Sequence, residues 1–358
     1  ARRHRRMVRW GILGAGHISS DFVNALKLVP DATVVAVAAS NGPRAEEFAK
    51  AHGIARFHAS YAELSKDPDV DIVYVATLHT SHRDHTLLCL RAGKHVLVEK
   101  PMAVNEKQAR RMVDVAKEKR LFLMEAMWTR FFPAVRRAQE LLSLGAIGTV
   151  RTVHSDFGLK YPPETQRIWD LKLGGGALLD IGVYPVAAAS WAFGGRAPVK
   201  VACVGTRGPT KVDTSAAISL QYEEGVASIS VSGLVTTPGE TTIVGTNGSI
   251  RIHGPSHCPT KITLTIAGKT PQDSEFPLPA TLPGQKFNFP HSQGLAYEAI
   301  AVQQCLAKGY LECPEAPLLE SVEVMKILDA ARAELDVVYP CEQDVGFMRR
   351  AESFVQAL

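Results

Sequence analysis

A lysine followed by a proline ends an apolar segment, and its type and place suggest chemistry. Lys100 follows the run 94–98 and Glu99, which we predict as a strand. Pro101 confines Lys100 to extended backbone geometry and so aims its side chain in one direction. A lysine partly removed from water there can take up or release a proton near neutral pH. On spacing alone, however, an ordinary surface lysine at a strand end is the better explanation.

An aspartate and a tyrosine follow a run of three glycines further along the chain. Asp180 and Tyr184 are four residues apart, so a helix would place them on one face. Pro185 lacks an N–H, which predicts a kink or a helix start near Gly182. A phenol there can hydrogen-bond a reacting alcohol and relay its proton, particularly if the Lys100 ammonium lowers the pKa of the phenol. Tyrosine statistics alone favour a half-buried packing role.

A glycine-rich turn near the start joins a predicted strand to a predicted helix. The strand Val8–Leu13, the turn and the next strand, 33–38, make a β-α-β unit of about 30 residues, the context of a dinucleotide-binding turn. Glycines allow the tight turn and let backbone amides approach a pyrophosphate at the helix N-terminus. Ser19 replaces the third glycine and is small enough for close packing. Without that context, an ordinary tight turn would explain the motif. The predicted cofactor contacts here are Gly14, Ala15, Gly16, His17 and Ile18.

The end of the second strand indicates which dinucleotide binds. NAD enzymes usually place an acidic residue there for the adenosine ribose, but no acid occurs until Glu46. Ser40 and Asn41 can donate to a phosphate, and Arg44 can pair with its charge. We therefore expect NADP(H) to be preferred, with NAD(H) use still open. The alternative is that Arg44 is a solvated residue in the first turn of the next helix.

Further apolar runs alternate with helical patterns and predict a doubly wound parallel sheet. The runs are 70–76, 94–98 and 121–125. Ligands of such sheets bind at the carboxyl ends of the strands. The polar residues that leave these strand ends are Thr77, His79, His82, Glu99 and Lys100. His79, His82 and His85 lack metal-motif spacing, so we expect no metal.

After Met127 the pattern changes to strands and predicts a second domain. The strands are 149–154, 200–205, 216–221 and 226–234, and Thr246-Asn247-Gly248 predicts a hairpin turn. We predict domains at 1–126 and 127–342, a late helix at about 321–335 bracing the first domain, and an extension at 343–358. Alternation of Ser228, Ser230 and Ser232 with apolar residues predicts a small, polar-tolerant outer face. Composition gives equal weight to a dimer interface and a solvent-facing sheet.

Composition sets the remaining limits. The chain has 358 residues, 46% of them hydrophobic and 21% charged, which is typical of a folded protein long enough for two domains. A formal net charge of +4 is too small to indicate a nucleic-acid partner. We see no apolar run approaching a membrane span, and six scattered cysteines without a CxxC pair suit a cytoplasmic protein. The Arg-rich start is no secretory signal, although it leaves organellar import open.

The segments VRWGILGAGHISSDF, VATLHTSHRDH, GKHVLVEKPMAVN, LFLMEAMWTRFFP and GGGALLDIGVYP resemble the glucose–fructose oxidoreductase/inositol dehydrogenase/MocA family, in its branch of dimeric dihydrodiol and NADP-dependent D-xylose dehydrogenases. The resemblance implies a Rossmann domain followed by an α+β domain with a large, open, mostly antiparallel sheet, and a homodimer formed through that sheet. It implies that Lys100 and Tyr184 transfer the proton, that Asp180 orients substrate or lysine, and that Arg130 lies near the cofactor. The position of Ser40 is often basic in near relatives, which weakens the expected phosphate recognition.

These features predict hydride transfer between NADP and the CH–OH group of a sugar or cyclic diol. The resemblance places several aromatic residues near the substrate mouth, although each alone suits a core. The predicted pocket residues are Trp128, Phe132, Phe157, Trp169 and Phe289. Two alternatives remain open at this stage. One is a reductase of a ketose, anhydroketose or dicarbonyl, and the other is a non-catalytic NADP(H)-binding sensor.

Overall fold

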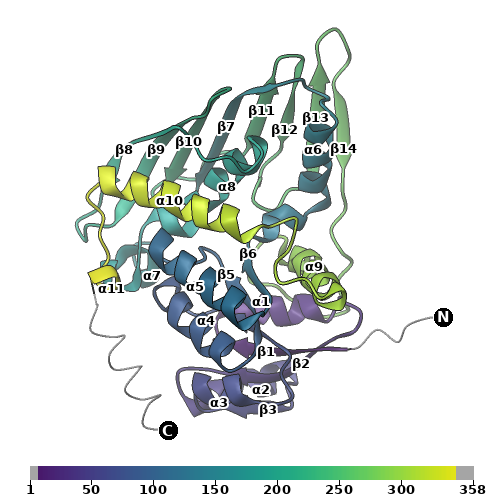
Figure 1. Cartoon of the computed structure of the whole chain (residues 1–358), viewed down its shortest axis with the longest axis vertical. Helices are drawn as coiled ribbons and strands as arrows, with labels where there is room; N and C mark the ends of the chain where they lie inside the picture. Colours follow the sequence, from purple (N-terminus) through teal and green to yellow (C-terminus); the bar gives the residue numbers. More distant parts are fainter. Residues whose placement is uncertain (1–6, 344–358) are drawn as a thin grey trace, which may run out of the picture.

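The computed structural model describes residues 7–343, which form a lower and an upper sheet in Figure 1. Within these residues, six parallel strands build the lower sheet in the order β3-β2-β1-β4-β5-β6. This is the order of a doubly wound dinucleotide-binding fold, so the predicted fold class is confirmed. The strands are β1 (Val8–Leu13), β2 (Ala32–Ala38), β3 (Arg56–His58), β4 (Ile72–Val75), β5 (His95–Glu99) and β6 (Leu123–Ala126).

Helices cover the lower sheet because its strands are apolar on both faces. All four residues of β4 are buried, and the Phe22 ring of the first helix stacks on Tyr74 at 3.9 Å between centroids. Trp10 packs edge-on against Phe22 at 5.3 Å. Burial on both faces is what a parallel sheet requires. The helices are α1 (His17–Leu26), α2 (Gly42–His52), α3 (Tyr61–Lys66), α4 (His82–Arg91) and α5 (Glu106–Lys119).

The upper sheet is open and mostly antiparallel. In the described part of the chain its order is β14-β13-β12-β11-β7-β10-β9-β8, and only β7 and β10 pair in parallel. The predicted hairpin is present, since Gly245 pairs with Gly248 around the turn. The strands are β7 (Val150–Gly158), β8 (Lys200–Arg207), β9 (Asp213–Gln221), β10 (Val226–Ser232), β11 (Thr241–Gly245), β12 (Gly248–Ile252), β13 (Lys261–Ile266) and β14 (Gln272–Glu275).

The helices of the second half lie against one face of the upper sheet or return to the lower one. α6 (Pro133–Ser143) and α8 (Val183–Ala192) contact the upper sheet (Figure 1). α9 (Leu295–Lys308) packs against α1, and α10 (Leu318–Glu334) packs against α5, α8 and β8. The remaining helices are α7 (Gln166–Trp169) and α11 (Pro340–Gln343). The two halves are therefore joined by packed helices.

The stretch Leu171–Ala192 corrects one expectation from the sequence. It is long and apolar enough to cross a membrane by length and composition, but 83% of its apolar window is buried inside the protein. α8 lies within this stretch, and nine of its ten residues are buried. The apolar character reflects a core helix between the upper sheet and α10.

Candidate active site

Lys100 lies directly after β5, and a buried carboxylate fixes its backbone. Glu99 is 7% exposed, accepts the Tyr74 hydroxyl at 2.5 Å and accepts the Lys100 backbone N–H at 3.1 Å. Burial raises the pKa of Glu99, and the Lys100 charge opposes this shift. The end of β5 and this carboxylate hold Lys100 at the carboxyl edge of the sheet, where ligands of doubly wound folds bind.

The Lys100 side chain reaches the second half of the chain and ends beside Asp180. Its Nζ donates to the Asp180 main-chain carbonyl at 2.6 Å and lies 3.5 Å from Oδ1. Arg167 donates to Oδ1 at 2.8 Å, and the Tyr161 hydroxyl donates to Oδ2. Burial alone would raise the pKa of Asp180, but the Lys100 and Arg167 charges outweigh it and lower this pKa. Asp180 is thus a fixed carboxylate that holds the lysine.

Tyr184 follows Asp180, and its ring lies under the lysine. Lys100 Nζ is 5.1 Å from the Tyr184 ring centroid, and Trp128 Nε1 donates to the Tyr184 hydroxyl at 3.1 Å. Burial and the Glu99 carboxylate raise the pKa of Tyr184 well above that of a free phenol. The condition that Lys100 lowers this pKa is not met, because burial dominates. Tyr184 remains a protonated phenol at neutral pH.

Aromatic rings surround Tyr184 on its other sides. The Phe157 ring centroid lies 5.7 Å from that of Tyr184, and the His257 ring lies 5.4 Å from it. Phe157 and His257 stack at 4.5 Å with an angle of 17° between their planes. Trp128 and Phe157, both predicted as pocket residues, therefore meet at Tyr184, and His257 joins them.

The backbone between the glycine run and α8 is held by a buried aspartate. Residues Leu178–Gly182 form a π-helical turn, a geometry often found at functional sites, and α8 begins next to Gly182 as predicted. Asp213 is fully buried and accepts the Leu178 backbone N–H at 2.7 Å. Burial outweighs these backbone hydrogen bonds and raises the pKa of Asp213 to about 6. Asp213 therefore fixes the start of the turn that carries Asp180.

Two more side chains hold the glycine run from distant parts of the chain. His79 Nε2 donates to the Gly174 carbonyl at 2.7 Å, and burial lowers the His79 pKa, which favours the neutral ring. The Tyr339 hydroxyl donates to the Gly175 carbonyl at 3.0 Å. The first sheet and the end of the described chain thus both position this run.

The glycine turn before α1 fits a dinucleotide pyrophosphate. Gly14 has a φ of +115°, and a Cβ there would lie 2.5 Å from the Ala76 carbonyl oxygen. A Cβ on Gly16 would meet no atom within 4 Å, so the turn is open at this point. Gly16 caps α1 without a side-chain hydrogen bond, which leaves first-turn amides free for an anion. Ala15 and Ile18 are half-buried beside this opening, and His17 is exposed.

The residues expected to select NADP lie in the exposed segment after β2 and at the start of α2. The Asn41 side chain accepts the Arg44 backbone N–H at 3.0 Å and so caps α2. Arg44 Nη2 donates to the Ala15 carbonyl at 3.2 Å, which places the guanidinium next to the glycine turn. Ser40 is exposed beside them. One cation and one hydroxyl therefore stand at this corner of the cleft.

The other residues predicted at strand ends, His82 and Thr77, lie next to the Lys100–Pro101 backbone. His82 is 1% exposed and lies between the Pro101 carbonyl, 2.9 Å from Nδ1, and the Thr77 carbonyl, 3.1 Å from Nε2. Burial lowers the pKa of His82 to about 3. The Thr77 hydroxyl pairs with His85 Nδ1 at 2.9 Å. His82 therefore supports the Lys100–Pro101 backbone.

Four predicted residues lie outside the cluster around Tyr184. Arg130 is 6% exposed and bonds the Glu315 carbonyl and the Glu320 carboxylate, so it joins the turn before α6 to α10. Phe132 is fully buried behind Trp128, and Trp169 donates to the Pro162 carbonyl. Phe289 is 43% exposed, and its backbone N–H donates to Asp21 in α1.

Comparison with known proteins identifies the family. Residues 8–127 match the oxidoreductase family with an NAD-binding Rossmann fold, Gfo/Idh/MocA, and residues 135–251 match the C-terminal domain of that family. A trans-1,2-dihydrobenzene-1,2-diol dehydrogenase from Bos taurus is 43% identical over 336 residues, covering 93% of this chain and 98% of the relative. The chain belongs to the Gfo/Idh/MocA oxidoreductase family. The human enzyme of the same name is 42% identical over the same shares of both chains.

Solved structures agree with this assignment. KijD10, a 3-ketoreductase from Actinomadura kijaniata in complex with NADP, is 26% identical with a TM-score of 0.75 and covers 91% of this chain and 97% of its own. A levoglucosan dehydrogenase in complex with NADH and levoglucosan has a TM-score of 0.81 at 20% identity, covers 92% and 97%, and shows the fold alone. This Gfo/Idh/MocA chain is an NAD(P)-dependent dehydrogenase.

Sequence reasoning missed three side chains of the site in this dehydrogenase. Tyr161 and Arg167 bind Asp180, and His257 stacks on Phe157, but none stands in a recognisable spacing pattern. Arg167 shortly before the glycine run was the nearest signal. Only the folded chain brings the three to Asp180 and Tyr184.

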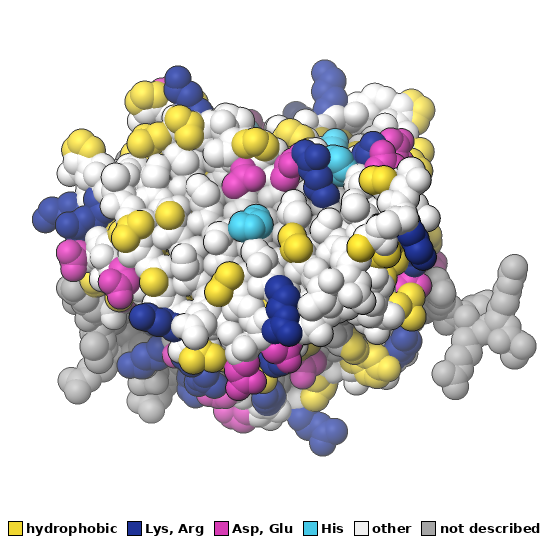
Figure 2. All heavy atoms as spheres, turned by 90° about the horizontal axis from the view of Figure 1, so that it is seen from above, with side chains coloured by type: hydrophobic (Ala, Val, Ile, Leu, Met, Phe, Trp, Pro, Cys, Tyr) yellow, Lys and Arg dark blue, Asp and Glu magenta, His cyan; other side chains and the backbone are white. Residues whose placement is uncertain are grey.

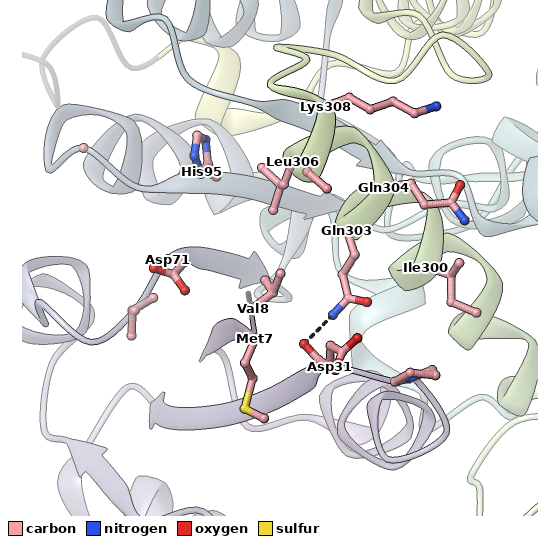
Figure 3. A pocket seen from close by; sticks show the side chains of 14 residues that line it. Met7, Val8, Asp31, Asp71, His95, Ile300, Gln303, Gln304, Leu306 and Lys308 are labelled. Carbon is pink, nitrogen blue, oxygen red and sulfur yellow. Dashed lines mark hydrogen bonds between the residues drawn. The ribbon is translucent and has the colours of Figure 1, made fainter. Parts of the chain in front are cut away.

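A separate cavity lies at the opposite edge of the lower sheet. Its volume is about 800 Å³, and it lies between the amino ends of the strands and α9 (Figure 3). Gln303 of α9 donates to the Asp31 carbonyl at 3.0 Å within it. The chemistry described above lies at the carboxyl ends, so this cavity is not the active site. Among residues 7–343, no group of three or more His, Cys, Asp or Glu side chains is placed to hold a metal.

Proposed function

We propose that this dehydrogenase exchanges a hydride between a nicotinamide and the CH–OH carbon of a sugar or cyclic diol, with Lys100 and Tyr184 handling the proton. The observation that carries the proposal is the Lys100 ammonium, 5.1 Å from the Tyr184 ring centroid at the carboxyl edge of the Rossmann sheet. The names of the relatives, dihydrodiol dehydrogenase and 3-ketoreductase, support this substrate class. When bound, the nicotinamide supplies the redox centre.

Each side chain has a separate task. The Tyr184 hydroxyl, whose oxygen already accepts the Trp128 N–H, binds the reacting oxygen and carries its proton. Lys100 hydrogen-bonds the same oxygen in its charged form and accepts the proton when it is neutral. Asp180 holds the Lys100 amine, and Arg167 and Tyr161 hold Asp180. The aromatic walls exclude water from the reacting carbon.

Reduction of a carbonyl is the second candidate, and the Tyr184 pKa favours it. A phenol whose pKa is raised by burial is protonated at neutral pH and suits proton donation to a carbonyl oxygen. In the oxidation, the alcohol proton passes to Tyr184 as the phenol gives its own proton to a neutral Lys100, which then releases it to solvent. Rates measured in both directions with one substrate pair show which direction dominates.

The test of the proposed proton pair is separate replacement of its two members. We expect Lys100→Met and Tyr184→Phe each to lower kcat by about 10²–10⁴-fold while the cofactor still binds, because each removes one step of proton transfer. Fluorescence of bound NADPH measures binding, and absorbance of the reduced nicotinamide measures turnover of D-xylose, D-glucose, a trans-dihydrodiol and a dicarbonyl. Undiminished turnover in either variant would contradict its role. Binding without turnover of any substrate by the unmodified protein would favour a sensor.

We further propose a preference for NADP(H), supported by Arg44 beside the glycine turn and by the absence of an acid at positions 39–45. Arg44→Ala should weaken NADP⁺ binding by about tenfold or more and leave NAD⁺ binding unchanged, because a charge-assisted hydrogen bond to phosphate is lost. Calorimetric titration of both cofactors measures this, and Arg91→Ala, an exposed arginine on α4, serves as control. Equal losses for both cofactors would contradict the preference.

We also propose a homodimer formed through the outer face of the upper sheet. Seen from above, the molecule shows scattered acidic and basic side chains among a larger number of uncharged ones (Figure 2). On β10 and β9, Ser230 pairs with Ala217, which pairs with the exposed Val204 of β8. Ala217→Arg should convert a dimer to a monomer in sedimentation analysis, whereas Ala51→Arg on α2 should not. A wild-type monomer would exclude this interface.

A further inference from the structure

His257 is the one ring of the cluster around Tyr184 that carries two nitrogens, and both lack a protein partner among residues 7–343. The Trp128 nitrogen is engaged by the Tyr184 hydroxyl. The His257 face is engaged by Phe157, at 4.5 Å and 17°. The residue is part-exposed, and its nitrogens are not among the fully buried unpaired side-chain atoms of the described residues.

The loop between β12 and β13 holds His257 in place on both sides. The Thr129 hydroxyl donates to the His257 carbonyl, and the Ser256 N–H donates to the Gly239 carbonyl at 2.7 Å. The Cys258 carbonyl pairs with His291 Nδ1 at 2.8 Å. A ring stacked on one face and attached to a fixed backbone presents its nitrogens in one orientation, as a selective site requires.

Burial and the nearby Lys100 charge lower the pKa of His257 to about 3, so the imidazole is neutral at physiological pH. A neutral imidazole offers one donor and one acceptor. An alcohol hydroxyl can pair with either. A trans-dihydrodiol has one hydroxyl besides the reacting one, on the neighbouring carbon, and its other four ring carbons can pair with neither, whereas a sugar ring carries hydroxyls further from the reacting carbon. A substrate that covers these nitrogens without bonding them leaves polar groups unpaired, which is unfavourable.

Resting on the proposed function, we propose that His257 is a specificity-determining residue that hydrogen-bonds a substrate hydroxyl two or more carbons from the reacting one, so that the substrate is a polyhydroxylated sugar ring and not a dihydrodiol. The reacting carbon lies at Tyr184 and Lys100. The His257 ring centroid is 5.4 Å from that of Tyr184, so one six-membered ring reaches both. Phe157 supports the imidazole from behind.

The test compares two substrates in three variants. His257→Phe keeps the stacked ring and removes both nitrogens, and His257→Gln restores a donor and an acceptor. His253→Phe is the control, because His253 stands in the same loop but bonds Thr263 at 2.7 Å outside the ring cluster. We measure kcat and KM with NADP⁺ for D-glucose or D-xylose and for a trans-dihydrodiol, and melting temperatures verify folding.

We expect His257→Phe to lower kcat/KM for the sugar by about tenfold, mainly through KM, and to leave the dihydrodiol unchanged or improved. His257→Gln should recover part of the loss. For one of the monodeoxy glucoses, kcat/KM of the wild-type enzyme should be lower than for glucose by the same factor. His257→Phe should not lower kcat/KM for that sugar any further. Equal losses on both substrates, or none, would overturn the inference. A wild-type enzyme that oxidises the dihydrodiol but no sugar overturns it and leaves the proposed function standing, whereas turnover of neither removes both.

Discussion

Replacing Asp213 by asparagine should stabilise the protein at neutral pH and remove part of its acid dependence. Asp213 is fully buried, and one of its carboxylate oxygens has no hydrogen-bond partner among the described residues. Its pKa rises from 3.8 to about 6 because burial outweighs its backbone hydrogen bonds. Asparagine keeps an oxygen for the Leu178 N–H and carries no charge to bury.

The size and sign follow from proton linkage. Between the two pKa values the folded protein keeps the proton on Asp213 and the unfolded chain does not, so this carboxyl makes stability fall as pH rises through that window. At about 1.4 kcal/mol per pKa unit, ionised Asp213 lowers the free energy of unfolding by about 3 kcal/mol above pH 7, of which about 2 kcal/mol develops between roughly pH 4.5 and 7. The asparagine variant should lack this part.

Urea unfolding of both proteins at several pH values measures the effect. The stability gain of Asp213→Asn over the wild type should grow by about 2 kcal/mol from roughly pH 4.5 to 7 and then stay constant. Asp213→Ala is the control: it also removes the charge but leaves the Leu178 N–H unpaired, and should be less stable than Asp213→Asn by about 1–3 kcal/mol at every pH. A pH-independent difference between wild type and Asp213→Asn would refute the assigned ionisation.

Other predictions concern the site directly. Arg167→Met removes one of two cations that lower the Asp180 pKa, so the acid limb of the pH profile of kcat/KM should move to higher pH. An unmoved limb would show that ionisation of Asp180 does not set it. Gly16→Ala fills the open space of the glycine turn, and should weaken NADPH binding by about tenfold or more at an unchanged melting temperature, as fluorescence titration would show. Trp128→Phe deletes the hydrogen bond that lowers the Tyr184 pKa; kcat should fall about tenfold with cofactor affinity intact, and an unchanged kcat would dismiss that hydrogen bond as a contributor.

Local sequence signals predicted most of the fold. The first β-α-β unit and the buried strand β4 were predictable because their residues form apolar runs, which are typical of buried strands. The turn at Asn247 was predictable because its residue types favour a hairpin turn. The edge strand β3 escaped notice because Arg56–His58 is three residues long and none of them is buried. A short edge strand that pairs with a single neighbour and buries few side chains has no periodic pattern of apolar residues in its sequence.

The site was predictable where a short motif carries it and unpredictable where tertiary packing does. Lys100 and Tyr184 stand in recognisable motifs, and the fold brings them together. The Tyr184 pKa depends on burial by surrounding rings, which spacing does not encode. Arg130 shows the converse: a charged side chain within one of the quoted motifs is held by Glu315 and Glu320, which lie far along the chain.

The contact between Tyr339 and Gly175 has a consequence for how the enzyme matures. Arg332 likewise donates to the Val104 carbonyl at 3.0 Å, so residues that follow α10 or lie within it hold segments synthesised much earlier. A nascent chain that still lacks α10 contains Lys100, Asp180 and Tyr184. It lacks the Tyr339 hydroxyl, which hydrogen-bonds the glycine run before Asp180. We therefore expect a stop codon before position 339 to yield a protein that binds the nucleotide but does not turn over substrate.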